Sequence, residues 1–174
     1  MVRSFDDCLD ERDRKVIEDV ARVGWHVINI AAERGRPGWS FSIGLFQTFG
    51  QPEVVVFGLR SELGYRVING IGVAIKAGRR FAVDGEYPDI LADVRCLFKP
   101  VQRRWYEPFL GYARWYYEGD EFPVLQCIWP DKQQNYPWQP AFKAEWAWLQ
   151  PFLFHENPVI ARAADLLESL EESE

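Results

Sequence analysis

The residues with the clearest chemical potential lie between Trp129 and Trp138, a segment that also contains one tyrosine, two prolines and an aspartate. An indole ring covers a large apolar area while its N–H donates a hydrogen bond, and the prolines restrict the neighbouring backbone. Asp131 can accept hydrogen bonds from turn amides or from a ligand. Two interpretations remain open: Trp129, Asp131 and Trp138 form an aromatic wall around a ligand, or the rings close one end of the sheet and Asp131 is a turn former.

Three other polar residues are candidates for ligand binding: Gln126, Ser42 and Asn29. Gln126 lies in an apolar run that leads directly into the aromatic loop. Ser42 and Asn29 fall on the two arms of a predicted β-hairpin, and a hairpin centred on residues 35–36 would place them opposite each other. They could therefore present two hydrogen-bonding side chains on the same face.

The ionisable residues predict no catalytic set. His26 and His155 lie on distant segments, and neither has ligand-type spacing to a cysteine. His26 lies in an apolar segment, where the simplest interpretation is a core histidine with a hydrogen-bond partner. Glu53 follows a proline at the start of a strand and is interpreted as a solvated or capping carboxylate. The sequence thus predicts no metal site and no catalytic residue.

The nucleotide-binding motifs are also missing from the sequence. No G-x-x-x-x-G-K-[ST] pattern occurs, and the segment 70–72 lacks the third glycine of a dinucleotide fingerprint. The formal net charge is -6, and the acidic segment from Val159 onward carries most of it. The remaining body is nearly balanced and offers no broad basic patch, so nucleic acid is not an expected partner.

The cysteines and the N-terminal segment predict the cellular environment. The three cysteines form no C-x-x-C pair and are odd in number, which is typical of a reducing compartment. The first residues carry charges where a secretory signal needs its apolar region, and no run approaches the ~18 apolar residues of a membrane span. The simplest prediction is a cytoplasmic protein of bacterial type that has no membrane segment.

The elements that must position these residues can be read from hydrophobic periodicity and turn formers. The 174 residues predict a single domain, 1–174, large enough to bury a core. The expected elements are a helix over about 10–23, a hairpin of 25–31 with 40–45, a central strand 53–59, a helix from 61 to a stop at 78, strands 92–98 and 122–129, an aromatic-rich helix 105–117, and an acidic helix over about 159–172. These strands lie too close in sequence for βαβ units throughout. The fold class is therefore α+β, with a mainly antiparallel sheet that could close into a barrel, flanked by helices.

Three glycines interrupt the predicted helix after residue 61: Gly64, Gly70 and Gly72. Each costs a helix interior up to ~1 kcal/mol relative to alanine. We expect close packing of the helix backbone against the sheet to explain all three.

The order of several short motifs resembles the bacterial family called domain of unknown function 4262. These motifs are Gly24-Trp25, Phe41-Ser42-Ile43-Gly44-Leu45, Pro52-Glu53, Leu125-Gln126, Trp129-Pro130-Asp131, Pro137-Trp138 and Gln150-Pro151. The resemblance spans about residues 24–153 and implies a shared fold without an assigned reaction. The sequence departs from relatives at Phe41-Ser42, where Tyr-Thr is usual, and at Gln134, where relatives have a glycine. Because of the departure at Gln134, the resemblance does not predict the geometry of the turn at this position.

Two functions from different classes are consistent with these residues. The first is a non-catalytic binding module that needs no cofactor and uses the aromatic loop to bind a small molecule or a protein partner, such as a bacterial toxin. The second is a flavin-dependent oxidoreductase-like enzyme on a small antiparallel barrel, where backbone and aromatic contacts would hold the cofactor. The sequence predicts neither the identity of the ligand nor the oligomeric state.

Overall fold

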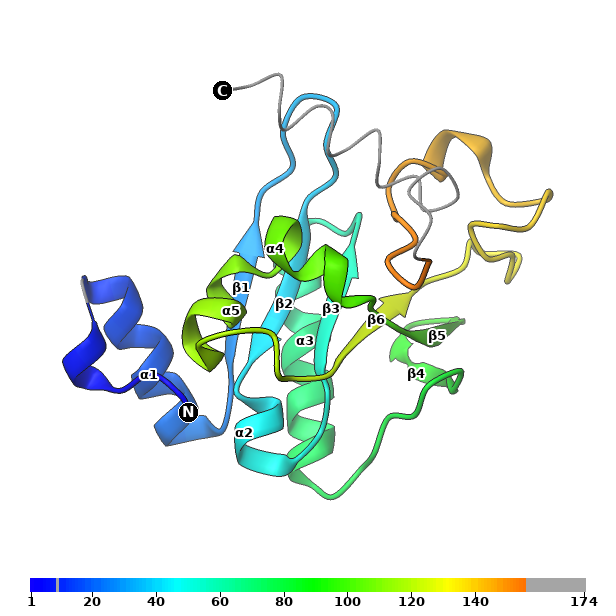
Figure 1. Cartoon of the computed structure of the whole chain (residues 1–174). Coiled ribbons are helices and arrows are strands. Elements are labelled where there is room, and N and C mark those ends of the chain that lie inside the picture. The colour runs from blue at the N-terminus through cyan, green and yellow to red at the C-terminus, as the bar shows by residue number, and fades with distance from the viewer. Residues whose placement is uncertain (9, 156–174) are drawn as a thin grey trace.

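The computed structural model describes residues 1–8 and 10–155, which form a six-stranded sheet with helices on both faces (Figure 1). The strand order is β1-β2-β3-β6-β5-β4. The strands are β1 (His26–Ile30), β2 (Trp39–Ile43), β3 (Glu53–Phe57), β4 (Glu86–Leu91), β5 (Val94–Pro100) and β6 (Val124–Ile128). Neighbouring strands pair antiparallel except β3 and β6, which are parallel. The α+β class and the mainly antiparallel sheet are therefore confirmed.

The expectation of a barrel is wrong, because the sheet is open, with β1 at one edge and β4 at the other. The helices explain why closure is unnecessary. A sheet covered on both faces buries its apolar side chains without curling onto itself. The helices are α1 (Glu11–Val23), α2 (Leu45–Phe49), α3 (Ser61–Lys76), α4 (Tyr106–Phe109) and α5 (Gly111–Tyr117), with 3-10 turns at Phe5–Asp7, Arg103–Trp105 and Ala144–Trp146.

The central strand β3 divides the core into two clusters. Val55 and Phe57 pack with residues of α1, α4 and α5 on one face of the sheet. Val54 and Val56 pack with residues of α3 on the other face. Every residue of β3 is buried, as expected for a strand that is apolar on both faces.

Local signals place the elements around β1. The Asp10 side chain accepts hydrogen bonds from the Arg12 and Asp13 amides at the start of α1, and Gly24 ends the helix in a left-handed conformation with φ 112°. This helix is confirmed, and β1 follows it almost at once. The hairpin is also confirmed, but its expected register is wrong.

The hairpin turn explains the difference in register. Reciprocal backbone hydrogen bonds between Glu33 and Arg36 close the turn one residue earlier than expected. Asn29 therefore lies opposite Ser40, and Ser42 lies opposite Val27. The two candidate side chains are not cross-strand partners.

Other differences arise where tertiary contacts outweigh local pattern. The sequence did not predict β4, an edge strand whose residues are all exposed or half-buried. The expected helix over 105–117 is divided at Leu110, whose φ of -127° and ψ of 31° separate α4 from α5. The acidic helix expected over 159–172 lies outside the described residues. Within residues 1–8 and 10–155, no helix is both long enough and apolar enough to cross a membrane.

The glycines of α3 have different environments. Gly64 lies against the Ser40 side chain, and Gly72 lies against the indole ring of Trp25, so close packing is confirmed at these two positions. Gly70 is exposed, and a methyl group built there would meet no atom within 4 Å. The packing explanation is wrong for Gly70.

Candidate functional site

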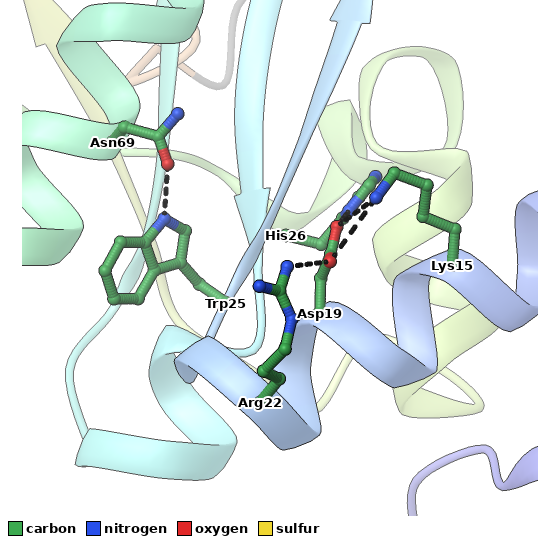
Figure 2. Close-up of polar contacts among 6 residues, drawn as sticks. All are labelled: Lys15, Asp19, Arg22, Trp25, His26 and Asn69. Atoms are coloured by element: carbon green, nitrogen blue, oxygen red, sulfur yellow. Dashed lines mark hydrogen bonds and ion pairs between the residues drawn. The ribbon is translucent and has the colours of Figure 1, made fainter.

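A pocket of about 270 Å³ lies where α1, the start of β1 and α3 meet, at the β1 edge of the sheet. We call it the α1–α3 pocket. Its lining includes Lys15, Asp19 and Arg22 from α1, Trp25 just before β1, His26 and Val27 at the start of β1, and Tyr65 and Asn69 from α3. The short connection after α1 brings the polar residues of the helix beside the first residue of β1 (Figure 2).

The centre of this pocket is a hydrogen-bonded pair, Asp19 and His26. The distance from His26 Nδ1 to Asp19 Oδ2 is 2.8 Å. The same carboxylate accepts hydrogen bonds from Lys15 Nζ at 3.1 Å and from Arg22 Nη2 at 3.0 Å, as Figure 2 shows. The His26 and Asp19 side chains are 13% and 15% exposed, so the pair is accessible but largely shielded.

The protonation state of Asp19 determines the tautomer of His26. Burial raises the pKa of Asp19, but the hydrogen bonds from His26, Arg22 and Lys15 outweigh burial and lower it below its ordinary value. Asp19 is therefore an ionised carboxylate at neutral pH and can only accept hydrogen bonds. His26 Nδ1 must carry the hydrogen of that contact, which leaves the lone pair of the neutral ring on Nε2.

His26 is neutral at pH 7. Burial lowers the pKa of His26, and the hydrogen bond to Asp19 raises it only in part, while the Lys15 charge opposes protonation. No residue among 1–8 and 10–155 makes a hydrogen bond to Nε2. The pocket lining therefore includes one neutral ring acceptor without a hydrogen-bond partner among these residues. Solvent can reach this atom, since no fully buried polar side-chain atom of the described residues lacks a partner.

Trp25 and Asn69 connect β1 to α3 at the other side of the pocket. The Trp25 indole Nε1 donates to Asn69 Oδ1 at 2.9 Å, which leaves the Asn69 amide N–H groups as donors. The indole is 4% exposed and packs against the backbone of α3 at Gly72. A glycine at that position permits the close approach, because any side chain would overlap the ring.

The structure places the aromatic loop residues in different environments. Trp129 is buried, its Nε1 donates to the Phe57 carbonyl at 2.8 Å, and its own backbone is bound by the Gln150 side chain. Asp131 is 3% exposed and accepts hydrogen bonds from the Gln133 and Asn135 amides, each at 2.9 Å. Burial raises the pKa of Asp131, but the hydrogen bonds, mainly from Asn135, outweigh it and lower the pKa. The polar groups of both residues are used within the fold.

Gln126 and Trp138 also contact the segment after residue 150. Gln126 is fully buried, donates to the Pro151 carbonyl at 2.6 Å and accepts from the Leu153 amide at 3.1 Å. Trp138 is 40% exposed and stacks on Tyr136, with ring centroids 5.2 Å apart. Gln126 and Trp129 therefore both form hydrogen bonds with the segment 150–153, whereas Trp138 lies near the surface.

Ser42 and Asn29 belong to neither the loop nor the α1–α3 pocket. Asn29 accepts a hydrogen bond from Ser40 Oγ at 2.5 Å. Ser42 Oγ donates to Glu53 Oε2 at 2.5 Å, inside the core. Glu53 is 1% exposed and also accepts hydrogen bonds from the Gly44 and Phe46 amides and the Tyr117 hydroxyl. Glu53 is therefore not solvated, but the capping alternative is confirmed, because it accepts from the Gly44 and Phe46 amides at the start of α2. Burial raises the pKa of Glu53 despite these four contacts.

Sequence reasoning missed Lys15, Asp19, Arg22 and Asn69 as site residues. The signals for three of them were available in α1, where Asp19 has cations at spacings i-4 and i+3. Such spacing is also common on solvated helices, so it does not indicate a pocket by itself. The hydrogen bond expected for His26 is present, but the side chain lines a pocket rather than the core.

A second and larger cleft, of about 440 Å³, is lined by residues of α2, β5, β6 and the turn at Arg103–Trp105. Its charged residues, Arg103 and Glu121, pair with each other across the rim. The Tyr106 hydroxyl donates to the Phe122 carbonyl at 2.8 Å. These polar groups already form hydrogen bonds within the fold, so fewer of them are left for a ligand in this cleft than in the α1–α3 pocket.

The open mixed sheet with helices on both faces defines an α+β domain with a polar pocket at one sheet edge. The chain belongs to the family described as Domain of unknown function (DUF4262), whose sequence profile matches residues 19–143. The match includes Asp19, His26 and Asn69 but not Lys15. No curated protein and no solved structure matches the chain. Gln134, where the resemblance implies a glycine, has a left-handed φ of 67° that a glycine would adopt readily.

Proposed function

We propose that this domain is a binding module that holds a small polar molecule in the α1–α3 pocket. One observation carries the proposal: His26 lines the pocket, and its Nε2, an acceptor in the neutral ring, makes no hydrogen bond within residues 1–8 and 10–155. Water can reach this acceptor, and a ligand that binds in the pocket would take the place of water as its hydrogen-bond partner. Binding alone can provide that partner, so the proposal requires no chemical step.

The other polar groups of the pocket support a ligand with several hydrogen-bonding atoms. Arg22 uses one nitrogen of its guanidinium on Asp19, and the rest of its donors remain. Lys15 likewise keeps part of its ammonium for another acceptor. Asn69 has amide N–H groups, and Tyr65 brings a hydroxyl and an exposed ring to the rim. Donors and one acceptor thus surround a space of molecular size.

A second candidate is a protein partner that docks on the aromatic loop. Trp138 and Tyr136 form a stacked pair, and Trp138 is 40% exposed, which is typical of an aromatic contact residue. The flavin alternative depended on a small closed barrel. Because the sheet is open, that fold argument does not support a flavin.

The test is a search for ligand by thermal shift, with mass spectrometry of molecules that co-purify. At a ligand concentration of 100 times Kd, binding to the folded state stabilises it by about 2.7 kcal/mol. We expect this stabilisation to disappear in His26→Gln and to persist in His155→Gln, a control at the only other histidine of the sequence. A ligand whose effect survives His26→Gln but is lost in Trp138→Ala would contradict the pocket and favour the loop.

A further inference from the structure

We infer that the α1–α3 pocket selects a small hydroxylated anion, such as a hydroxy acid. Its anionic oxygens would bind the cations on α1, and its hydroxyl would donate to His26 Nε2. This inference rests on the proposed function and specifies the chemical class of the ligand.

The charges of the pocket favour an anion. Lys15 and Arg22 are cationic, Asp19 is their shared anionic partner, and His26 is neutral. One positive charge is therefore in excess beside a cavity that is partly shielded from water. A ligand with a single negative charge balances it, whereas a cationic ligand would add to the repulsion.

The tautomer of His26 adds a second requirement. Asp19 fixes the hydrogen on Nδ1, so Nε2 can only accept while the ring is neutral. A carboxylate oxygen placed against Nε2 would bring two lone pairs together. A ligand that also carries an O–H group satisfies Nε2 and still offers its anionic oxygens to Lys15 and Arg22.

The size of the pocket limits the ligand. Its volume of about 270 Å³ is below the usual range of about 300–1,000 Å³ for pockets that bury drug-sized molecules. The expected ligand is therefore a compact metabolite rather than a nucleotide or flavin. The neighbouring Trp25 is 4% exposed and packs against α3 at Gly72, so the wall on that side cannot open without repacking.

The test compares three probes of similar size: lactate, propionate and 1-amino-2-propanol. Lactate carries both the anion and the hydroxyl, propionate lacks the hydroxyl, and the amino alcohol replaces the anion with a cation. Binding is followed by NMR at the Trp25 indole N–H and the Asn69 side-chain amide, which report on the pocket. We expect lactate to bind about fivefold more tightly than propionate, as one hydrogen bond predicts, and the amino alcohol to bind most weakly.

Three variants separate the two contacts. His26→Ala should reduce the affinity for lactate to that for propionate, while His155→Ala should keep the preference. Lys15→Gln changes a side chain that is 65% exposed, so the fold should persist. This variant should weaken both anions by a similar factor and leave the preference for the hydroxyl unchanged, which keeps the test valid if His26→Ala does not fold.

Several outcomes would overturn the inference. Equal binding of lactate and propionate, tighter binding of the amino alcohol, or a preference for lactate that survives in His26→Ala would each do so. If none of the three probes changed the NMR signals of the Trp25 indole and the Asn69 amide, the inference would also be overturned. The proposed function would still stand in any of these cases if a different molecule stabilised the protein and lost that effect in His26→Gln.

Discussion

Alanine substitutions at two glycines of α3 test how Trp25 is held beside the α1–α3 pocket. In Gly72→Ala the added methyl would lie 2.7 Å from both Cδ2 and Cζ2 of Trp25 and closer still to Cε2. The indole cannot simply rotate away, because it is 4% exposed and its Nε1 is bound to Asn69. In Gly70→Ala the methyl would meet no atom within 4 Å.

The two variants share the same gain in helix propensity but differ in packing. Alanine in place of glycine stabilises a helix interior by about 0.5–1 kcal/mol. Overpacking of a core costs about 1–3 kcal/mol. Gly70→Ala should therefore stabilise the protein by about 0.5–1 kcal/mol, and Gly72→Ala should be less stable than Gly70→Ala by about 1–3 kcal/mol.

Urea denaturation of the parent and both variants measures these differences, provided that the slope with denaturant is unchanged. NMR of the Trp25 indole N–H shows whether the ring has moved, and Gly72→Ala should also weaken any ligand of the pocket. Equal stabilisation by both substitutions, with an unmoved indole signal, would refute the conclusion that the approach of α3 fixes Trp25.

Four further predictions concern single side chains. Trp129→Ala should cost about 3–5 kcal/mol in denaturation, as a large core truncation does, and a smaller cost would contradict its role in packing. Glu53→Gln should cost about 1–3 kcal/mol, because an amide cannot accept from all the donors around it, and an unchanged midpoint would refute this account. The pKa of His26 in the folded state is lowered, so its contribution to stability is present above the ordinary pKa of about 6.5 and is lost as pH falls toward the folded value. Denaturation across this pH range should show a fall in the free energy of unfolding, and His26→Gln should remove that fall. Thiol labelling should modify Cys8 before the two buried cysteines, and fast labelling of a core thiol would indicate an opening there.

Much of the fold could be predicted because local and global preferences agree. The helix that ends at Gly24, the hairpin after it and the buried strand Glu53–Phe57 each have a periodicity that matches their burial. Other features depend on contacts between distant segments. The parallel pairing of β3 with β6 has no local signal, and the edge strand Glu86–Leu91 has no buried residue that would give it a strand-like hydrophobic pattern. An open sheet and a barrel can share the same strands, so periodicity could not decide between them.

The candidate pocket was harder to predict than the fold. Asp19 and His26 are on different elements, and their contact depends on the angle at which β1 leaves α1. Asn69 reaches the same place from α3, and no sequence pattern links it to the other two. Composition favoured the aromatic loop instead, because tryptophan and proline stand out in a sequence whereas a lysine, an aspartate and an arginine on a helix do not.

Two carboxylates of this chain show what separates a structural polar network from a candidate site. Glu53 is buried and accepts four hydrogen bonds from Ser42, Tyr117 and two backbone amides, so its network is complete within the fold. Asp19 also has its partners, but it holds the ring of His26, a residue that lines a pocket and whose Nε2 makes no hydrogen bond to the described residues. Burial and a shifted pKa are common to both sites and therefore do not distinguish them. The acceptor without a partner distinguishes them, because only water or a ligand can stabilise such a group with a hydrogen bond.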